Sequence, residues 1–278
     1  MKTLLFLCIS AATGYAATFP TEYQAAMQLY VSNKIPEANL AFTALIASAP
    51  NAQTKDLALM QASYCEAQLK HPEQAMTLAA GIKDKQLGTL CRMKMLAIQS
   101  KYAELLALVK NEDFSLWPDA LSFEALMVRG DASGRARDVV AAQTDFRAAL
   151  GYTLNDYKKA TAYLRLAWLF EGQQALDNLE EVMKLKEPGA TMRYQAIAAR
   201  AHILAANGKG ALAMGEFERI NELTKQPHWS MVQMARAATH EALGEPDKAR
   251  ACYEAVVASS NPPADSLATA KAKLAAKR

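Results

Sequence analysis

Glycine, proline and long apolar runs are scarce in this chain. Its 278 residues include only 12 glycines and 10 prolines, although 51% of the residues are hydrophobic. Strand-like apolar runs bounded by turn residues are missing, and alanine is abundant, which predicts an all-helical protein. No segment after the N-terminal stretch is long and apolar enough to span a bilayer, so we expect no integral membrane span in the mature chain.

Cysteine is also rare, with four residues in the whole sequence. Cys8 lies in the N-terminal stretch, which leaves Cys65, Cys91 and Cys252. An odd, small number of cysteines does not make a disulfide framework. Cys65 and Cys91 can pair in an oxidising compartment, or they can remain as buried thiols that pack like small apolar residues.

The charge balance excludes a typical nucleic-acid binder. Lysine and arginine number 31 against 28 aspartates and glutamates, so the formal net charge is only +3. Proteins that bind nucleic acid usually concentrate basic residues in a patch. The nearest approach to one is the C-terminal stretch from Lys271 to Arg278, which we interpret as a solvated terminal helix.

Motifs for catalysis or metal binding are missing as well. The four histidines form no His-x-x-x-His pair, and no His-Glu-x-x-His or Cys-x-x-Cys motif occurs. Gly208-Lys209-Gly210 lacks the Gly-Lys-Ser/Thr of a phosphate-binding loop and is interpreted as a helix–helix turn. We therefore predict no catalytic residue, no metal site, no cofactor and no enzymatic activity.

The N-terminus has the pattern of a secretory signal peptide. Lys2 provides a positive charge, Leu4 to Ala12 is a short apolar stretch, and Gly14 and Ala16 are small residues ahead of a cleavage point. The pattern predicts a signal peptide over residues 1–16 and an exported mature protein. No Asn-x-Ser/Thr sequon occurs, which favours a bacterial periplasm, with secretion as the alternative.

The stretch from Leu243 to Pro262 shows a distinct helical pattern. After a turn at Gly244, the residues Ala249, Tyr253 and Val256 fall on one face of a helix, because they are spaced by four and three. An alanine on that face lets a neighbouring helix approach closely, and the tyrosine fills the space beside it. Positions equivalent to Ala249 recur about every 35 residues along the mature chain. These positions are Ala38, Ala75, Leu105, Ala142, Ala175 and Ala213.

This pattern resembles the tetratricopeptide repeat family, whose second helix has a turn glycine, a small residue, a large one, a small one and a closing proline. The resemblance implies an all-α fold, namely an α-solenoid of about seven helix-turn-helix repeats within residues 17–278, with a C-terminal capping helix. The expected repeats cover residues 19–52, 56–86, 87–115, 119–152, 155–188, 191–226 and 229–262, and the capping helix covers 264–278.

The resemblance also implies where a ligand binds. In tetratricopeptide arrays the first helices of the repeats line a concave groove. Their expected groove residues in this chain are Tyr23, Met27, Tyr30, Met60, Tyr64, Leu90, Lys94 and Met127. A mixture of methionine and tyrosine suits an apolar peptide or a partner helix. The alternative is that these side chains pack against neighbouring helices or the segment next to the signal peptide.

The sequence thus predicts a non-enzymatic scaffold for protein–protein interaction in the bacterial cell envelope. Its partner is an unidentified protein or peptide. The lysine, asparagine and arginine set with which some family members hold a C-terminal carboxylate is not reproduced. Two alternatives stay open: a domain that assists an enzyme or binds its substrate, and a structural protein that associates with copies of itself.

Overall fold

The computed structural model describes residues 19–152, 155–223, 229–259 and 262–276. The predicted signal peptide, residues 1–16, lies outside the described residues. Fifteen α-helices and one short 3₁₀ helix, η1, make up the secondary structure of the described part, which contains no strand. The all-α prediction is therefore confirmed.

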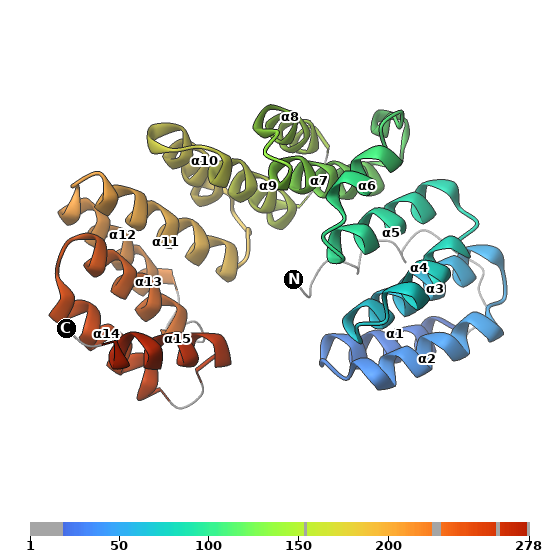
Figure 1. Ribbon diagram of the computed structural model, residues 1–278, viewed down its shortest axis with the longest axis horizontal. Coiled ribbons are helices and arrows are strands. Elements are labelled where there is room, and N and C mark those ends of the chain that lie inside the picture. The colour runs from blue at the N-terminus through green and yellow to red at the C-terminus, as the bar shows by residue number, and fades with distance from the viewer. Residues whose placement is uncertain (1–18, 153–154, 224–228, 260–261, 277–278) are drawn as a thin grey trace. The chain divides into compact units, whose positions relative to one another are not determined.

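The helices follow one another with short turns (Figure 1). Up to the middle of the chain they are α1 Phe19–Val31, α2 Ile35–Ser48, α3 Ala52–Gln68, α4 Pro72–Ala80, α5 Lys85–Ile98, α6 Tyr102–Leu108, η1 Phe114–Leu116 and α7 Asp119–Arg135. After it they are α8 Val139–Leu150, α9 Asp156–Leu169, α10 Gly172–Lys184, α11 Ala190–Ala206, α12 Gly210–Leu223, α13 Trp229–Ala242, α14 Pro246–Val257 and α15 Ala264–Ala275.

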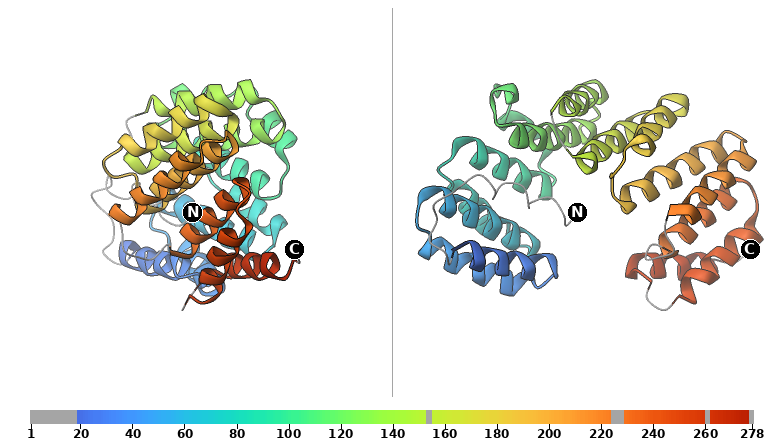
Figure 2. Two further views of the ribbon diagram at one scale, coloured as in Figure 1. Left: turned by 90° about the vertical axis from the view of Figure 1, so that its left-hand side faces the viewer. Right: turned by 180° about the vertical axis from the view of Figure 1, so that it is seen from behind.

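The chain forms two compact units, which meet in sequence within α8. The first unit ends at Asp145 and the second begins at Phe146. In each unit the helices pack in sequence order, such as α1 on α2 and α2 on α3 in the first, or α9 on α10 and α10 on α11 in the second (Figure 2). No helix among the described residues is both long and apolar enough to cross a membrane.

Several helices begin where the sequence supplies a capping residue. The side chain of Asn51 accepts a hydrogen bond from the backbone N–H of Thr54 at the start of α3, and Thr54 completes a capping box. Asp84 and Asn155 cap α5 and α9 in the same way. Each cap satisfies a backbone donor that has no partner within its helix.

The turn between the two helices of a pair has a recurrent conformation. The residue five positions before the small residue of the second helix has a positive φ in six of the seven predicted repeats. These residues are Asn33, Lys70, Ser100, Arg137, Gly208 and Gly244. A left-handed residue after a helix ends it by satisfying the last carbonyls, and it strongly favours glycine. Four of the six turns nevertheless have a residue other than glycine at this position. The backbone conformation of the turn is therefore the same although the residue type differs.

Replacing Gly244 with alanine should destabilise the second unit by about 1–2 kcal/mol, because a Cβ is disfavoured at its φ of 70°. No neighbouring atom would touch that Cβ, so the loss reports the backbone conformation alone. Gly215→Ala is the matched control: Gly215 lies inside α12 with equally open surroundings, and alanine should stabilise it by about 1 kcal/mol. Urea unfolding followed by circular dichroism measures both. Two changes of the same sign would contradict the turn assignment.

The apolar cores join successive helix pairs. One cluster in the first unit combines Tyr23 of α1, Phe42 of α2 and Ala58 of α3. The next combines α3 and α4 with Cys91 and Met95 of α5. In the second unit, further clusters join α9 and α10 to α11, then α10 to α13, and then α13 to α15. The pairs in these clusters therefore share their apolar faces with a neighbouring pair, as expected of stacked repeats.

The seven small positions predicted from the sequence are all buried. Each is at most 2% exposed. Leu105, the one large residue of the set, is also fully buried, on the short helix α6.

Two arginines link the helices of a pair by partly buried ion pairs. Arg129 of α7 binds Asp145 of α8 with two hydrogen bonds, from Nε to Oδ2 at 2.9 Å and from Nη2 to Oδ1 at 2.6 Å. Arg200 of α11 donates from Nε to Glu216 of α12 at 3.0 Å and also binds Glu180 of α10. Both arginines precede the acid of the next helix by 16 residues.

The described cysteines are free thiols, and two of them are buried. Burial raises the pKa of Cys65 to about 12 and that of Cys91 to about 11. The Oγ atom of Ser63 lies 3.0 Å from Sγ of Cys91. Cys252 is partly exposed, although burial raises its pKa as well.

The three described cysteines should react with a thiol reagent in the order of their exposure. Burial disfavours the Cys91 thiolate and shields its sulfur, so iodoacetamide should modify Cys252 first in the native protein. Cys65 and Cys91 should react at the rate of Cys252 only after denaturation. Peptide mass spectrometry with and without urea checks this, and rapid native labelling of Cys91 would contradict its burial.

Candidate binding surface

The eight residues predicted to line a groove lie on α1, α3, α5 and α7, but most of their side chains are buried. The six buried residues are Tyr23, Met27, Met60, Tyr64, Leu90 and Met127, each at most 9% exposed. Tyr30 and Lys94 are partly exposed. Neighbouring side chains cover these six residues, so they are not accessible to a partner in this conformation. Their contact with a partner stays a prediction.

Tyr23 shows this packing most clearly. Its ring lies 5.9 Å from the ring of Phe19 in a stacked arrangement and 5.6 Å from the ring of Phe42 in an edge-on arrangement. Such pairs stabilise a core beyond the area they bury. Tyr23 therefore belongs to the core between α1 and α2.

Three of the helices bring charged and aromatic side chains together. Nζ of Lys94 on α5 donates a hydrogen bond to Oε2 of Glu124 on α7 at 3.0 Å. The same Nζ lies 5.7 Å from the centre of the Tyr64 ring on α3. Both charged side chains are about one-fifth exposed, so the ion pair is only partly covered.

The surroundings keep Tyr64 neutral and Lys94 charged. Burial is the largest influence on Tyr64 and raises the pKa of its phenol, while nearby Lys94 lowers it less. Burial acts on Lys94 in the opposite direction, but Tyr64 and Glu124 outweigh it and raise the pKa of the ammonium group. The group is thus a fixed positive charge at physiological pH.

More accessible side chains lie one helical turn further along each helix. Gln68 and Ile98 are exposed, and Val128 is partly exposed. Residues four apart share a helix face, so each lies beside a member of the charged and aromatic set. Gln68, Lys94, Ile98, Glu124 and Val128 together form what we name the first-helix surface, which lies next to the buried Tyr64 ring.

A hydrogen bond extends this surface toward the first pair. The side-chain amide of Gln68 donates to the hydroxyl of Tyr30, which joins α3 to α1. Burial raises the pKa of Tyr30, and the bond from Gln68 partly offsets it. The phenol therefore stays neutral and is available as a hydrogen-bonding group at a partly exposed site.

Three of these residues, Glu124, Gln68 and Ile98, were not predicted from the sequence. Glu124 follows Lys94 by 30 residues, the same spacing that separates Lys94 from Tyr64. A search for polar residues at that spacing on predicted first helices finds it. Ile98 gave no such signal, since an isolated isoleucine near a helix end is expected to pack inward.

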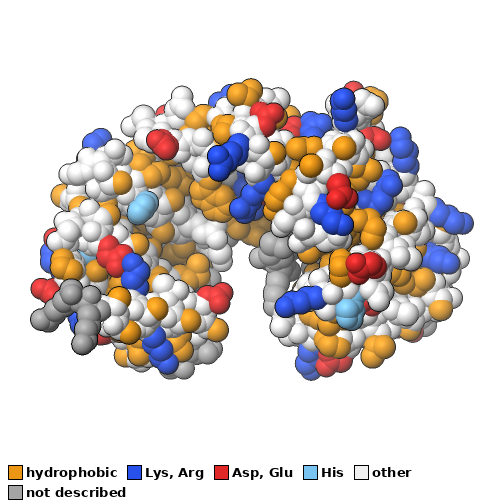
Figure 3. Space-filling model, viewed as in Figure 1, with side chains coloured by type: hydrophobic (Ala, Val, Ile, Leu, Met, Phe, Trp, Pro, Cys, Tyr) orange, Lys and Arg blue, Asp and Glu red, His pale blue; other side chains and the backbone are white. Residues whose placement is uncertain are grey.

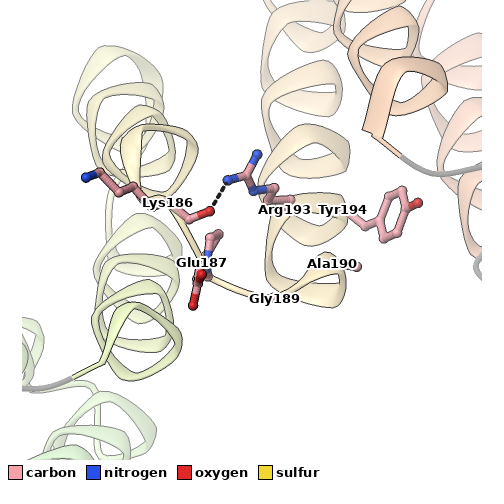
Figure 4. Close-up of a pocket in the computed structure, with 7 residues that line it drawn as sticks. Lys186, Glu187, Gly189, Ala190, Arg193 and Tyr194 are labelled. Carbon is pink, nitrogen blue, oxygen red and sulfur yellow. Dashed lines mark hydrogen bonds between the residues drawn. The ribbon is translucent and has the colours of Figure 1, made fainter.

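A separate cavity of about 410 Å³ lies in the second unit, where the chain enters α11 (Figure 4). It is lined by Lys186, Glu187, Pro188, Gly189, Ala190, Arg193 and Tyr194. Nη2 of Arg193 is bound to the backbone oxygens of Leu185 and Lys186, both at 2.8 Å. The guanidinium thus stabilises the loop, and the cavity brings no nucleophile together with a general base.

Neither a set of metal ligands nor a patch of one charge sign marks another candidate site in the described part of the chain. No group of three His, Cys, Asp or Glu side chains suited to a metal ion occurs among the described residues. On the face that Figure 3 shows, basic and acidic side chains are interspersed. The first-helix surface is therefore the candidate binding site of the described residues.

Comparison with known structures identifies the fold. A crystal structure of a tetratricopeptide repeat protein from Parabacteroides merdae ATCC 43184 matches 93% of this chain and 98% of its own, with a TM-score of 0.55 and 13% sequence identity. This chain has the tetratricopeptide repeat fold. No protein-family model matches the sequence, and no curated protein is significantly similar to it.

In this tetratricopeptide fold α3, α5 and α7 are alternate helices of the first unit, and α5 packs on both α3 and α7. Their contacts place Tyr64, Lys94 and Glu124 on adjacent helices within one unit. At 13% identity the likeness concerns the fold, so the role of these residues is argued from their own geometry.

Proposed function

We propose that this protein is a non-enzymatic scaffold that binds an apolar peptide or a partner helix through the first-helix surface. The array that we propose is a single solenoid of about seven repeats over residues 17–278. Its place is the bacterial cell envelope, reached by export and removal of residues 1–16, with the periplasm as the expected compartment and secretion as the alternative.

The observation that carries the proposal is the set of Tyr64, Lys94 and Glu124 on three adjacent helices, with Ile98 beside it. The Ile98 side chain is 54% exposed, which gives a partner an apolar contact next to a fixed charge. Interfaces commonly combine an apolar centre with a few charged groups that set orientation. A helix laid across α3, α5 and α7 can use both.

The first experiment locates the contact. A photo-cross-linking residue, p-benzoylphenylalanine, replaces Ile98 in one variant and Leu40 in a control. Leu40 is 73% exposed but lies on α2, away from the first-helix surface. A partner that cross-links through position 98 and not through position 40 supports the proposal. Equal cross-linking at both positions, or at position 40 alone, would show that binding occurs elsewhere.

The second experiment tests the charge. Lys94→Ala should weaken binding of the cross-linked partner about tenfold or more, because it removes the ammonium group and leaves Glu124 without that hydrogen bond. Lys85→Ala is the matched control: Lys85 lies on the same helix, and its side chain is 80% exposed. Isothermal titration calorimetry gives both dissociation constants. Equal affinities for the two variants would rule out a role for Lys94.

A further inference from the structure

We draw no further inference here: the strongest candidate, the surface patch at the C-terminal end of α9 where the exposed Trp168 indole lies against Arg165, is an apolar face for which nothing in the described residues shows an occupant.

Discussion

Phe42→Ala is expected to lower the free energy of unfolding of the first unit by about 3–5 kcal/mol. The Phe42 side chain is fully buried, and its ring meets that of Tyr23 in the cluster that joins α1, α2 and α3. Alanine removes the ring from three helices at once and leaves a cavity that the neighbouring backbone can fill only in part. A loss this large is comparable with the whole stability of many domains.

Leu40→Ala is the control for this change, since Leu40 is on the same helix and 73% exposed. It should alter stability by about 0.5 kcal/mol or less. Repeat arrays do not always unfold in one step, so hydrogen exchange of α1 to α3 is the better measurement. If Leu40→Ala reduced protection of these helices as much as Phe42→Ala, the core assignment would be refuted.

Arg129→Ala is expected to cost about 3 kcal/mol or more. The side chain of Asp145 is only 5% exposed and receives two hydrogen bonds from the guanidinium. Without Arg129 the Asp145 carboxylate loses both hydrogen bonds, and its low exposure leaves little access for water to replace them. The guanidinium also lies 4.6 Å from the centre of the Phe114 ring, so its loss removes a second contact.

Two further variants separate the ion pair from general packing. Arg250→Ala removes an exposed arginine, 51% accessible, from its pair with Glu254 and should cost about 0.5 kcal/mol or less. The double variant Arg129→Met/Asp145→Leu removes both charges and should recover most of the stability lost in Arg129→Ala. Thermal unfolding of the wild type, the two single variants and the double variant measures these differences. A double variant as unstable as Arg129→Ala would mean that the stranded carboxylate is not the cause.

The helix pattern could be predicted because each element carries its own local signal. The alternation of small and large residues predicted the helix pairs, and the small positions are buried. Leu105, the one large residue among them, lies on the short helix α6, Tyr102–Leu108. The 3₁₀ helix η1 carries no periodic signal and was not predicted.

The candidate binding surface was harder to predict for a physical reason. First helices contact the previous pair, the next pair and solvent, so apolar side chains occur around much of their circumference. On α3 every residue from Thr54 to Cys65 is buried except Lys55 and Leu57. Periodicity cannot separate a methionine that faces a ligand from one that faces a neighbouring helix, such as Met60. Lys94 was named with the other seven residues only because the family resemblance places its position in the groove.

The repeated left-handed turn explains how a fold can be shared at 13% identity. The turn requires a backbone conformation, and the position five residues later requires a limited volume; neither requires one particular amino acid. Lys70 and Gly208 occupy equivalent turns, and Leu105 replaces the usual alanine. Substitutions can therefore accumulate at both positions while the helix pairs are preserved. In such an array the fold depends on the spacing between two structural constraints, and superposing backbones detects that spacing where few residues are identical.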